Sequence, residues 1–309
     1  MLTGLVLYHG IDSGAELAGY ARAAEQAGFD SIWVTERYFH EETFSLLGHL
    51  AASTDRMALG VGVVNPFTRH PALLAMAAAT VDRLSGGRMV LGLGRSDEWL
   101  IRDRLGLSYE RSLGDLERAA RTVRNLLSGQ AVQLGDGTDP IRLAVPPVQR
   151  PPRIFLAAIG PRALRLAGAI ADGVILNAYS PVGYVKWAVG EIRLSAERAG
   201  RDPDEVEITC MIVVRLTDDP EPLMPGLRRR IARLLAEPGM GQLLLGRAGL
   251  DSGIVDSVVA LDAAGRLAEA AALIPDELVD RLYAIGSAGE CLRRLNEYRR
   301  AGVTHPLVL

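Results

Sequence analysis

The sequence predicts an α/β fold: a (β/α)8 barrel of the TIM type, with inserted loops and helices, forming a single domain over residues 1–309. Short apolar runs alternate with longer amphipathic segments along the chain, and there are eight such runs. Strands that are apolar on both faces and separated by helices are typical of parallel βαβ units, and eight units close into a barrel. A doubly wound open sheet is the alternative fold.

The first half of the chain contains four strand–helix units. The first helix begins near Asp12 or Ser13, which are good N-cap residues, and ends at Gly28. From Leu17 onward its apolar residues keep the i, i+3, i+4, i+7 spacing of a helix with one buried face. Pro71 suits the first turn of the third helix. The expected strands are residues 5–8, 31–35, 57–64 and 88–94, and the later helices are residues 43–54, 71–84 and 109–129.

The second half begins with a Gly/Pro-rich segment, residues 135–152, which we expect to be a surface excursion, with a hairpin as one form of it. Four more strands follow at residues 153–158, 172–178, 206–216 and 304–309. The helices between them are residues 161–171, 182–200 and a long helical region over 221–301.

The end of the chain departs from the regular barrel pattern, because no final helix follows the strand at 304–309. The helical region before that strand, or a partner subunit, would have to cover the open flank. An exposed apolar flank favours self-association, so we expect a homodimer.

Composition limits the function classes. The chain has 23% charged residues and a formal charge of −3, with arginines spread along it, so a nucleic-acid partner is not expected. No basic region precedes an apolar segment at the N-terminus, and no run approaches the roughly 20 apolar residues of a membrane span. Two cysteines without metal spacing fit a reducing compartment, and the five histidines form no metal motif. We therefore expect a cytoplasmic protein with a small-molecule substrate, no membrane partner and no metal.

Polar residues follow nearly every predicted strand. In a parallel barrel the carboxyl ends of all strands open on one face, where catalytic groups collect. Loops are polar in any case, so single residues carry little weight, but the set as a whole favours a site. Its members are Tyr8, His9, Glu36, Arg37, Asn65, Thr68, Arg69, His70, Arg95, Ser96, Asp97, Glu98, Asn177, Tyr179, Ser180 and Arg215.

Two glycine-containing motifs follow strands. GLGRSD, residues 92–97, lacks the third glycine of a dinucleotide fingerprint and is a weak signal. AAIGPRAL, residues 157–164, places Gly160 and Pro161 at the start of a helix, where free backbone N–H groups suit a phosphate. A plain tight turn is the alternative for this second motif.

Residues 59–97, LGVGVVNPFTRHPALLAMAAATVDRLSGGRMVLGLGRSD, closely resemble the signature of the bacterial luciferase-like superfamily. They are most similar to its branch that depends on the deazaflavin coenzyme F420, typified by methylenetetrahydromethanopterin reductases. Residues 27–36, 171–181 and 274–303 resemble the same family. The resemblance implies a (β/α)8 barrel that holds a flavin-type ring at its C-terminal mouth.

The resemblance also implies a cofactor site. It implies a non-prolyl cis peptide at the end of the third strand, by position Gly62–Val63, whose bulge would press on the ring. It places an acidic residue near the ring and a phosphate at the small-residue loop after the fifth strand. With two strand-end asparagines, the predicted cofactor-binding residues are Gly62, Val63, Asn65, Asp97, Ala158, Ile159, Gly160 and Asn177.

One pair departs from the family pattern. Many relatives carry Asp-His after the second strand, and here the pair is Glu36-Arg37. Arg37 is a permanent cation and cannot act as an acid near neutral pH, but it could clamp an anionic substrate or the tail of the cofactor. The predicted catalytic residues are Asp97, Glu36 and Arg37.

The function predicted by the resemblance is an F420-dependent oxidoreductase that transfers a hydride between the deazaflavin ring and a small organic substrate. One alternative is an FMN-dependent luciferase-like monooxygenase, in which reduced flavin reacts with oxygen first. A second alternative is a non-catalytic flavin-binding relative, to which the Arg37 exchange and the missing final helix point. Neither substrate identity nor reaction direction is predicted.

Overall fold

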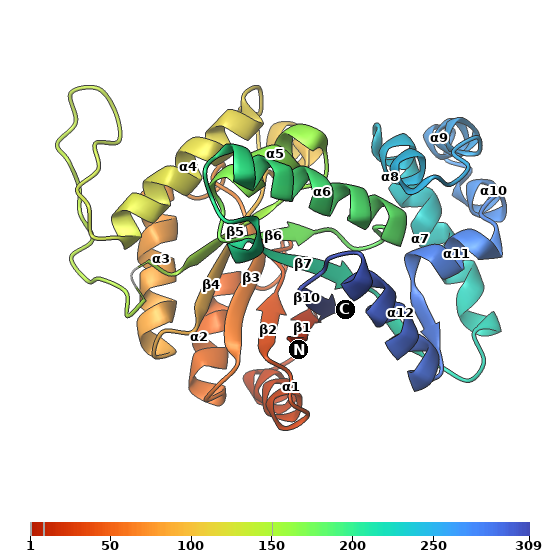
Figure 1. The fold of residues 1–309 in the computed structure, drawn as a ribbon, viewed down its shortest axis with the longest axis horizontal. Coiled ribbons are helices and arrows are strands. Elements are labelled where there is room, and N and C mark those ends of the chain that lie inside the picture. The colour runs from red at the N-terminus through yellow and green to blue at the C-terminus, as the bar shows by residue number, and fades with distance from the viewer. Residues whose placement is uncertain (1, 9, 150) are drawn as a thin grey trace.

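The computed structural model describes residues 2–8, 10–149 and 151–309, and it has a closed barrel of eight parallel strands (Figure 1). Around the barrel the strands follow the order β1-β10-β7-β6-β5-β4-β3-β2. The predicted barrel is confirmed, and the alternative of an open sheet is wrong. The barrel strands are β1 (Gly4–Leu7), β2 (Ser31–Val34), β3 (Ala58–Val64), β4 (Met89–Leu93), β5 (Arg153–Ala157), β6 (Gly173–Leu176), β7 (Glu207–Ile212) and β10 (His305–Val308).

Amphipathic helices cover the outside of the barrel, because their apolar faces pack on the outward side chains of the strands. Local signals fix several of their ends: Ser13 caps the first helix through the Glu16 N–H, and Ser287 and Glu290 form a capping box at the last. These helices are α1 (Gly14–Gln26), α2 (Thr43–Ser53), α3 (Pro71–Leu84), α4 (Ser112–Leu127), α5 (Pro161–Ile170), α6 (Val182–Arg198) and α12 (Ala288–Arg300). No helix follows β10 in the described ranges, and none of the described helices is long and apolar enough to cross a membrane.

Large side chains fill the inside of the barrel. Trp33 and Phe155 are almost fully buried, with ring centroids 5.7 Å apart. A Cβ at Gly60 would lie 2.2 Å from the Trp33 ring, so only glycine leaves room for the indole there. This packing closes the barrel below its C-terminal mouth.

A buried polar chain lies at the amino ends of the strands. The Trp33 indole N–H donates to Ser31 Oγ at 2.8 Å, and Ser31 Oγ lies 2.9 Å from Nε2 of His305. Nδ1 of His305 lies 2.7 Å from Glu207. Burial disfavours the Glu207 carboxylate, but its bonds to His305 and Arg153 outweigh burial and lower its pKa. These side-chain contacts tie β2, β7 and β10 together.

The prediction of a single seventh strand over residues 206–216 is wrong. β7 ends at Ile212, and the next residues form β8 (Val214–Leu216), which leaves the barrel and pairs with β9 (Ala284–Gly286) in a separate two-stranded sheet. β9 has only three residues and lies inside the predicted helical region, so its periodicity is too short to be recognised from the sequence.

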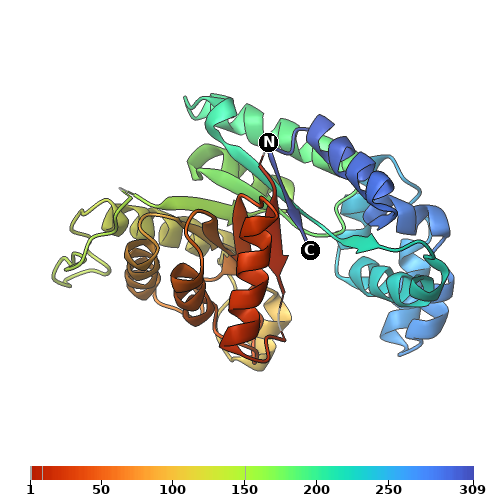
Figure 2. The same ribbon diagram turned by 90° about the horizontal axis from the view of Figure 1, so that it is seen from below.

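The region 221–301 is also not one helical stretch. Gly239 and Gly249 adopt left-handed φ values of 72° and 69°, which end one helix and begin the next. The resulting elements gather at one side of the barrel, the right side in Figure 1, and Figure 2 shows the same grouping. They are η3 (Glu221–Leu223), α7 (Met224–Ala236), α8 (Met240–Ala248), α9 (Val255–Ala263), α10 (Leu267–Ala272) and α11 (Asp276–Leu282).

The segment after α4 projects away from the barrel on the opposite side from α7–α11 in both views. An antiparallel bridge joins Val132 to Ile141, as the suggested hairpin requires. The predicted helix over 109–129 begins later, at Ser112, and a π-helix, η1 (Trp99–Arg104), precedes it. A short 3-10 helix, η2 (Pro203–Glu205), leads into β7.

Candidate active site

A cavity of about 820 Å³ lies at the carboxyl ends of the barrel strands, between them and α7. Val6, Met211 and Val213 form its apolar floor. Six side chains that the sequence placed after strands line it, as expected for the mouth of a parallel barrel. These are Tyr8, Arg37, Asp97, Asn177, Tyr179 and Arg215. His9, another candidate after the first strand, lies outside the described residues.

The backbone turns sharply where two of these side chains enter the cavity. Ser96, after β4, has a φ of 60°, and Tyr179, after β6, has a φ of 63°. Left-handed backbone at a residue other than glycine is unfavourable and recurs at functional sites. Tyr109 Oη donates to the Ser96 carbonyl at 2.8 Å and supports the turn that presents Asp97.

Tyrosine and arginine side chains are ordered against one another on the cavity wall. Arg37 donates to Tyr8 Oη at 3.1 Å, and its guanidinium lies 5.3 Å from the centre of the Tyr8 ring. The Arg230 guanidinium lies 5.7 Å from the Tyr179 ring, which meets Tyr283 edge-on at 5.2 Å. Burial raises the pKa of Tyr283, so its hydroxyl stays neutral. The wall thus combines flat apolar surfaces with fixed cations.

Two carboxyl groups share the cavity. Asp97 is open to the cavity, and the protein around it still raises the pKa of its carboxyl by desolvation. Burial also raises the pKa of Glu237, and the charge of Asp97 raises it further, while Arg230 lowers it. Each carboxyl therefore holds a proton at a higher pH than an ordinary surface carboxyl would, which suits a group that gives or takes a proton.

Strands β3 and β4 have the backbone that the resemblance implies at Gly62–Val63. The peptide bond between Gly62 and Val63 is cis, and the pairing of β3 with β4 shifts register between Val61 and Val64. A Cβ at Gly94 would lie 2.4 Å from Val63 Cγ2, and one at Gly92 would lie 2.0 Å from the Val61 carbonyl oxygen. The two glycines of GLGRSD therefore make room for the bulge of β3. This packing accounts for them without a dinucleotide-binding site.

Asn65 is buried, and its polar atoms are used inside its own loop. Its Oδ1 accepts from the N–H groups of Phe67 and Thr68 at 3.0 and 3.1 Å, and its Nδ2 donates to Tyr38. Asn65 therefore shapes the loop after β3 and does not line the cavity. The prediction that Asn65 binds the cofactor rests on its place at a strand end, which does not show where the side chain points.

Glu36 is likewise outside the cavity lining. Its carboxylate forms an ion pair with Arg69 and accepts from the Thr43 N–H at 3.3 Å. Arg69 also pairs with Glu42 at 2.7 Å. These bonds join the loops after β2 and β3, so Glu36 supports the rim, whereas its neighbour Arg37 faces the cavity.

Ala158, Ile159 and Gly160 connect β5 to α5. Gly160 is the N-cap of α5 and offers no capping side chain, and a Cβ built there meets nothing within 4 Å. The first N–H groups of a helix have no partners within it and bind anions. This geometry suits the phosphate that the loop is predicted to bind.

Comparison with known proteins now identifies the family. Residues 3–305 match the family model described as luciferase-like monooxygenase. The chain belongs to the luciferase-like monooxygenase family. The resemblance predicted from the sequence is therefore confirmed.

Relatives of this luciferase-like chain include a 5,10-methylenetetrahydromethanopterin reductase of Methanolobus tindarius, 32% identical over 295 residues, or 94% of this chain and 88% of the relative. An F420-dependent glucose-6-phosphate dehydrogenase of Nakamurella multipartita is 33% identical over 230 residues, or 69% of this chain and 67% of the relative. A solved F420-dependent tetrahydromethanopterin reductase from Methanopyrus kandleri superposes with a TM-score of 0.81 at 24% identity, covering 99% of this chain and 92% of that one. The structural match supports the shared fold.

Glu237 is one of the polar cavity residues of this luciferase-like chain that the sequence did not predict, together with Arg230, Arg233 and Tyr283. It follows α7, whose cavity face carries Leu227, Arg230, Leu234 and Glu237 at spacings of three and four residues. An ordinary surface helix places its apolar and charged residues on opposite faces. A face that carries both leucines and charged residues is therefore the sequence signal that could have indicated this part of the site.

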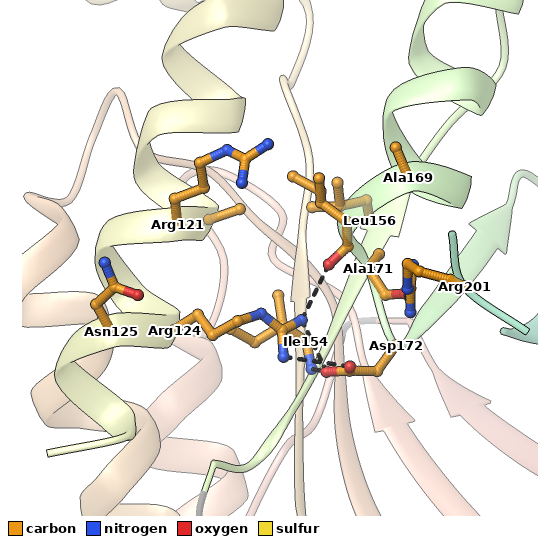
Figure 3. A pocket seen from close by; sticks show the side chains of 11 residues that line it. Arg121, Arg124, Asn125, Ile154, Leu156, Ala169, Ala171, Asp172 and Arg201 are labelled. Carbon is orange, nitrogen blue, oxygen red and sulfur yellow. Dashed lines mark hydrogen bonds and ion pairs between the residues drawn. The ribbon is translucent and has the colours of Figure 1, made fainter. Parts of the chain in front are cut away.

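A second cavity, of about 410 Å³, lies between α4 and α5 at the opposite end of the barrel (Figure 3). Arg124 pairs with Asp172 at 2.9 Å, and Arg201 donates to the carbonyls of Gly168 and Ala171 at 2.7 Å each. Asp172 also accepts from the Ile154 N–H at 2.8 Å. These bonds hold helices to the amino ends of strands, where barrels carry stabilising residues, so we assign this cavity no catalytic role.

Proposed function

We propose that this luciferase-like chain is a coenzyme F420-dependent oxidoreductase that transfers a hydride between the deazaflavin ring and a small organic substrate. Support comes from its relatives, whose names include F420-dependent reductases and dehydrogenases. The structural observation that carries the proposal is Asp97: the resemblance puts this carboxyl beside the ring, and it faces the large cavity with a raised pKa.

The residues at the barrel mouth suit this cofactor. The cavity of about 820 Å³ has an apolar floor and tyrosine rings against which a flat ring system can lie. The loop of Ala158, Ile159 and Gly160, with the N-terminus of α5, suits the phosphate. Asn177 lines the cavity and offers an amide at the end of β6, whereas Gly62 and Val63 of β3 are not among the lining residues.

When bound, the deazaflavin supplies a carbon that donates or accepts the hydride. Asp97 holds or releases a proton at its carboxyl, and its raised pKa lets it keep the proton to a higher pH than an ordinary aspartate does. Glu237 acts as the second proton-holding group on the same cavity. The apolar floor and the neutral Tyr283 form an uncharged part of the cavity surface.

Cofactor titration tests the proposal. We expect oxidised F420 to bind with micromolar or tighter affinity by fluorescence, FMN to bind at least about tenfold more weakly, and oxygen uptake to be absent with the reduced cofactor. A hydride-transfer panel with the F420-loaded protein then separates an enzyme from a non-catalytic relative, which would bind and never turn over.

The FMN-dependent monooxygenase is the second candidate, because the matched family model is described as a monooxygenase. Tight FMN binding together with oxygen consumption would establish this candidate and reject the first.

We also propose that the chain forms a homodimer, through α3. The flank expected to be exposed, Leu5 and Leu7 of β1 and Val308 of β10, is half-buried. By contrast, Leu73 and Met76 of α3 are 52% and 54% exposed. Exposed apolar side chains on one helix favour association through that helix.

A further inference from the structure

The cavity of the proposed oxidoreductase contains more positive than negative side chains. Four arginines line it, against the two carboxyl groups Asp97 and Glu237, so its formal charge is +2, although the whole chain has a formal charge of −3. The arginines are Arg37, Arg215, Arg230 and Arg233. Both carboxyls have raised pKa values, so each loses its negative charge at a higher pH than an ordinary carboxyl does.

These arginines come from separate parts of the fold. Arg37 follows β2, Arg215 belongs to β8, and Arg230 and Arg233 lie three residues apart on α7, where side chains share one face. Tertiary packing must bring three elements together to form this charge cluster. The cluster is therefore not produced by one basic segment of the sequence.

In the described part of the chain, three cations of the cluster, Arg215, Arg230 and Arg233, lack a side-chain carboxylate partner within ion-pair distance. Arg69 and Arg124, at other places, each form such an ion pair. Arg230 lies against the Tyr179 ring at 5.7 Å, which fixes its direction without cancelling its charge. Arginines gathered on one cavity wall make its potential positive, and an anion that binds among them is stabilised.

The proposed phosphate site of the cofactor lies elsewhere on the barrel mouth. Ala158, Ile159 and Gly160 belong to the β5–α5 loop and are not among the residues that line the cavity. The arginine cluster therefore remains available for a second anionic group.

We infer that the substrate of this enzyme is an anion, bearing a phosphate or carboxylate group that Arg230 and Arg233 of α7 bind while Arg37 closes the site from β2. The inference rests on the proposed function and names the substrate class for the same site. Guanidinium forks match the two oxygens of either group, and binding there would hold the reacting carbon of the substrate over the cavity floor, near Asp97.

Calorimetric titration of the F420-loaded protein tests the inference, with inorganic phosphate and acetate as separate probes at constant ionic strength. We expect one of the probes to bind the wild type. Binding should weaken at least about tenfold in Arg230→Gln and in Arg233→Gln, since each variant loses a charge-assisted hydrogen bond. Arg229→Gln is the matched control, because Arg229 is an exposed residue of the same helix that does not line the cavity, and it should bind as the wild type does.

The affinity for F420 distinguishes a substrate anion from the tail of the cofactor. We expect its Kd to stay within about twofold in both variants. A tenfold loss of F420 affinity, with probe binding only to the cofactor-free protein, would assign the arginines to the cofactor and overturn the inference. Equal probe binding by the wild type and by all three variants would also overturn the inference. If the wild type binds no F420, the proposed function fails instead, and the same titrations on the cofactor-free protein still test the anion site.

Discussion

Glu237, at the end of α7, and Asp97, in the loop after β4, face one cavity, and after burial it is the charge of Asp97 that raises the pKa of Glu237. The two residues lie 140 positions apart in the sequence, so only the folded barrel couples them. A coupled pair of carboxyls titrates over a wider pH range than either group alone, which allows one of them to be protonated while the other is charged.

Asp97→Asn should lower the rate of hydride transfer by about a hundredfold or more, the usual contribution of a general acid or base. F420 affinity should change little, because an amide keeps the size of the carboxyl. Rapid-mixing absorbance measurements of the deazaflavin would give both quantities. Glu98→Gln is the control, since Glu98 is exposed and pairs with Arg102 outside the cavity. If both variants turn over at the wild-type rate, Asp97 has no catalytic role.

The same substitution should change how stability depends on pH. The folded-state pKa of Asp97 is raised, so the folded protein binds more protons than the unfolded chain between the two pKa values. The wild type therefore loses stability as the pH rises from below the ordinary Asp pKa, about 3.9, through the raised one. Asp97→Asn removes this loss and should increase the melting temperature more at pH 7 than at pH 4. Equal shifts at both pH values would contradict the direction of the pKa change.

Gly92→Ala should destabilise the barrel by about 1–3 kcal/mol or more, because the added methyl would lie 2.0 Å from the Val61 carbonyl oxygen, a backbone atom with little freedom to move. Denaturant unfolding measures this change. Gly190→Ala is the control: Gly190 lies within α6 with nothing near its Cβ position, so alanine there should be neutral or stabilise by up to about 1 kcal/mol. Equal unfolding free energies for the two variants would mean that β4 does not need glycine to accommodate β3.

Much of the fold was predictable because barrel strands and their covering helices follow strong local rules. The eight strands and Pro71 at the start of α3 are examples. β8 and β9 were not predictable, since each has three residues and is defined by pairing with a segment seventy positions away. Local periodicity contains no information about such a pairing.

The site was predictable in position but not in the direction of each side chain. Arg37, Asp97 and Asn177 line the cavity as strand ends should, whereas Glu36 and Asn65, equally close to strand ends, bond within the rim. Which neighbour faces the cavity depends on a single backbone turn. Glu237 lies far from any barrel strand in sequence, so a search limited to strand ends cannot find it.

Dimerisation through α3 gives the last prediction. Leu73→Glu combined with Met76→Glu places two charges on exposed positions of this helix, 52% and 54% accessible, so folding of the single chain should be unaffected. A charge buried without a partner in an interface costs several kcal/mol, enough to shift a micromolar dimer to monomer. Sedimentation velocity should show a dimer for the wild type and a monomer for the double variant. Leu292→Glu, on α12 and 56% exposed, is the control and should remain dimeric. A dimer that survives the α3 changes but separates on Leu292→Glu would move the interface to the β10 side of the barrel.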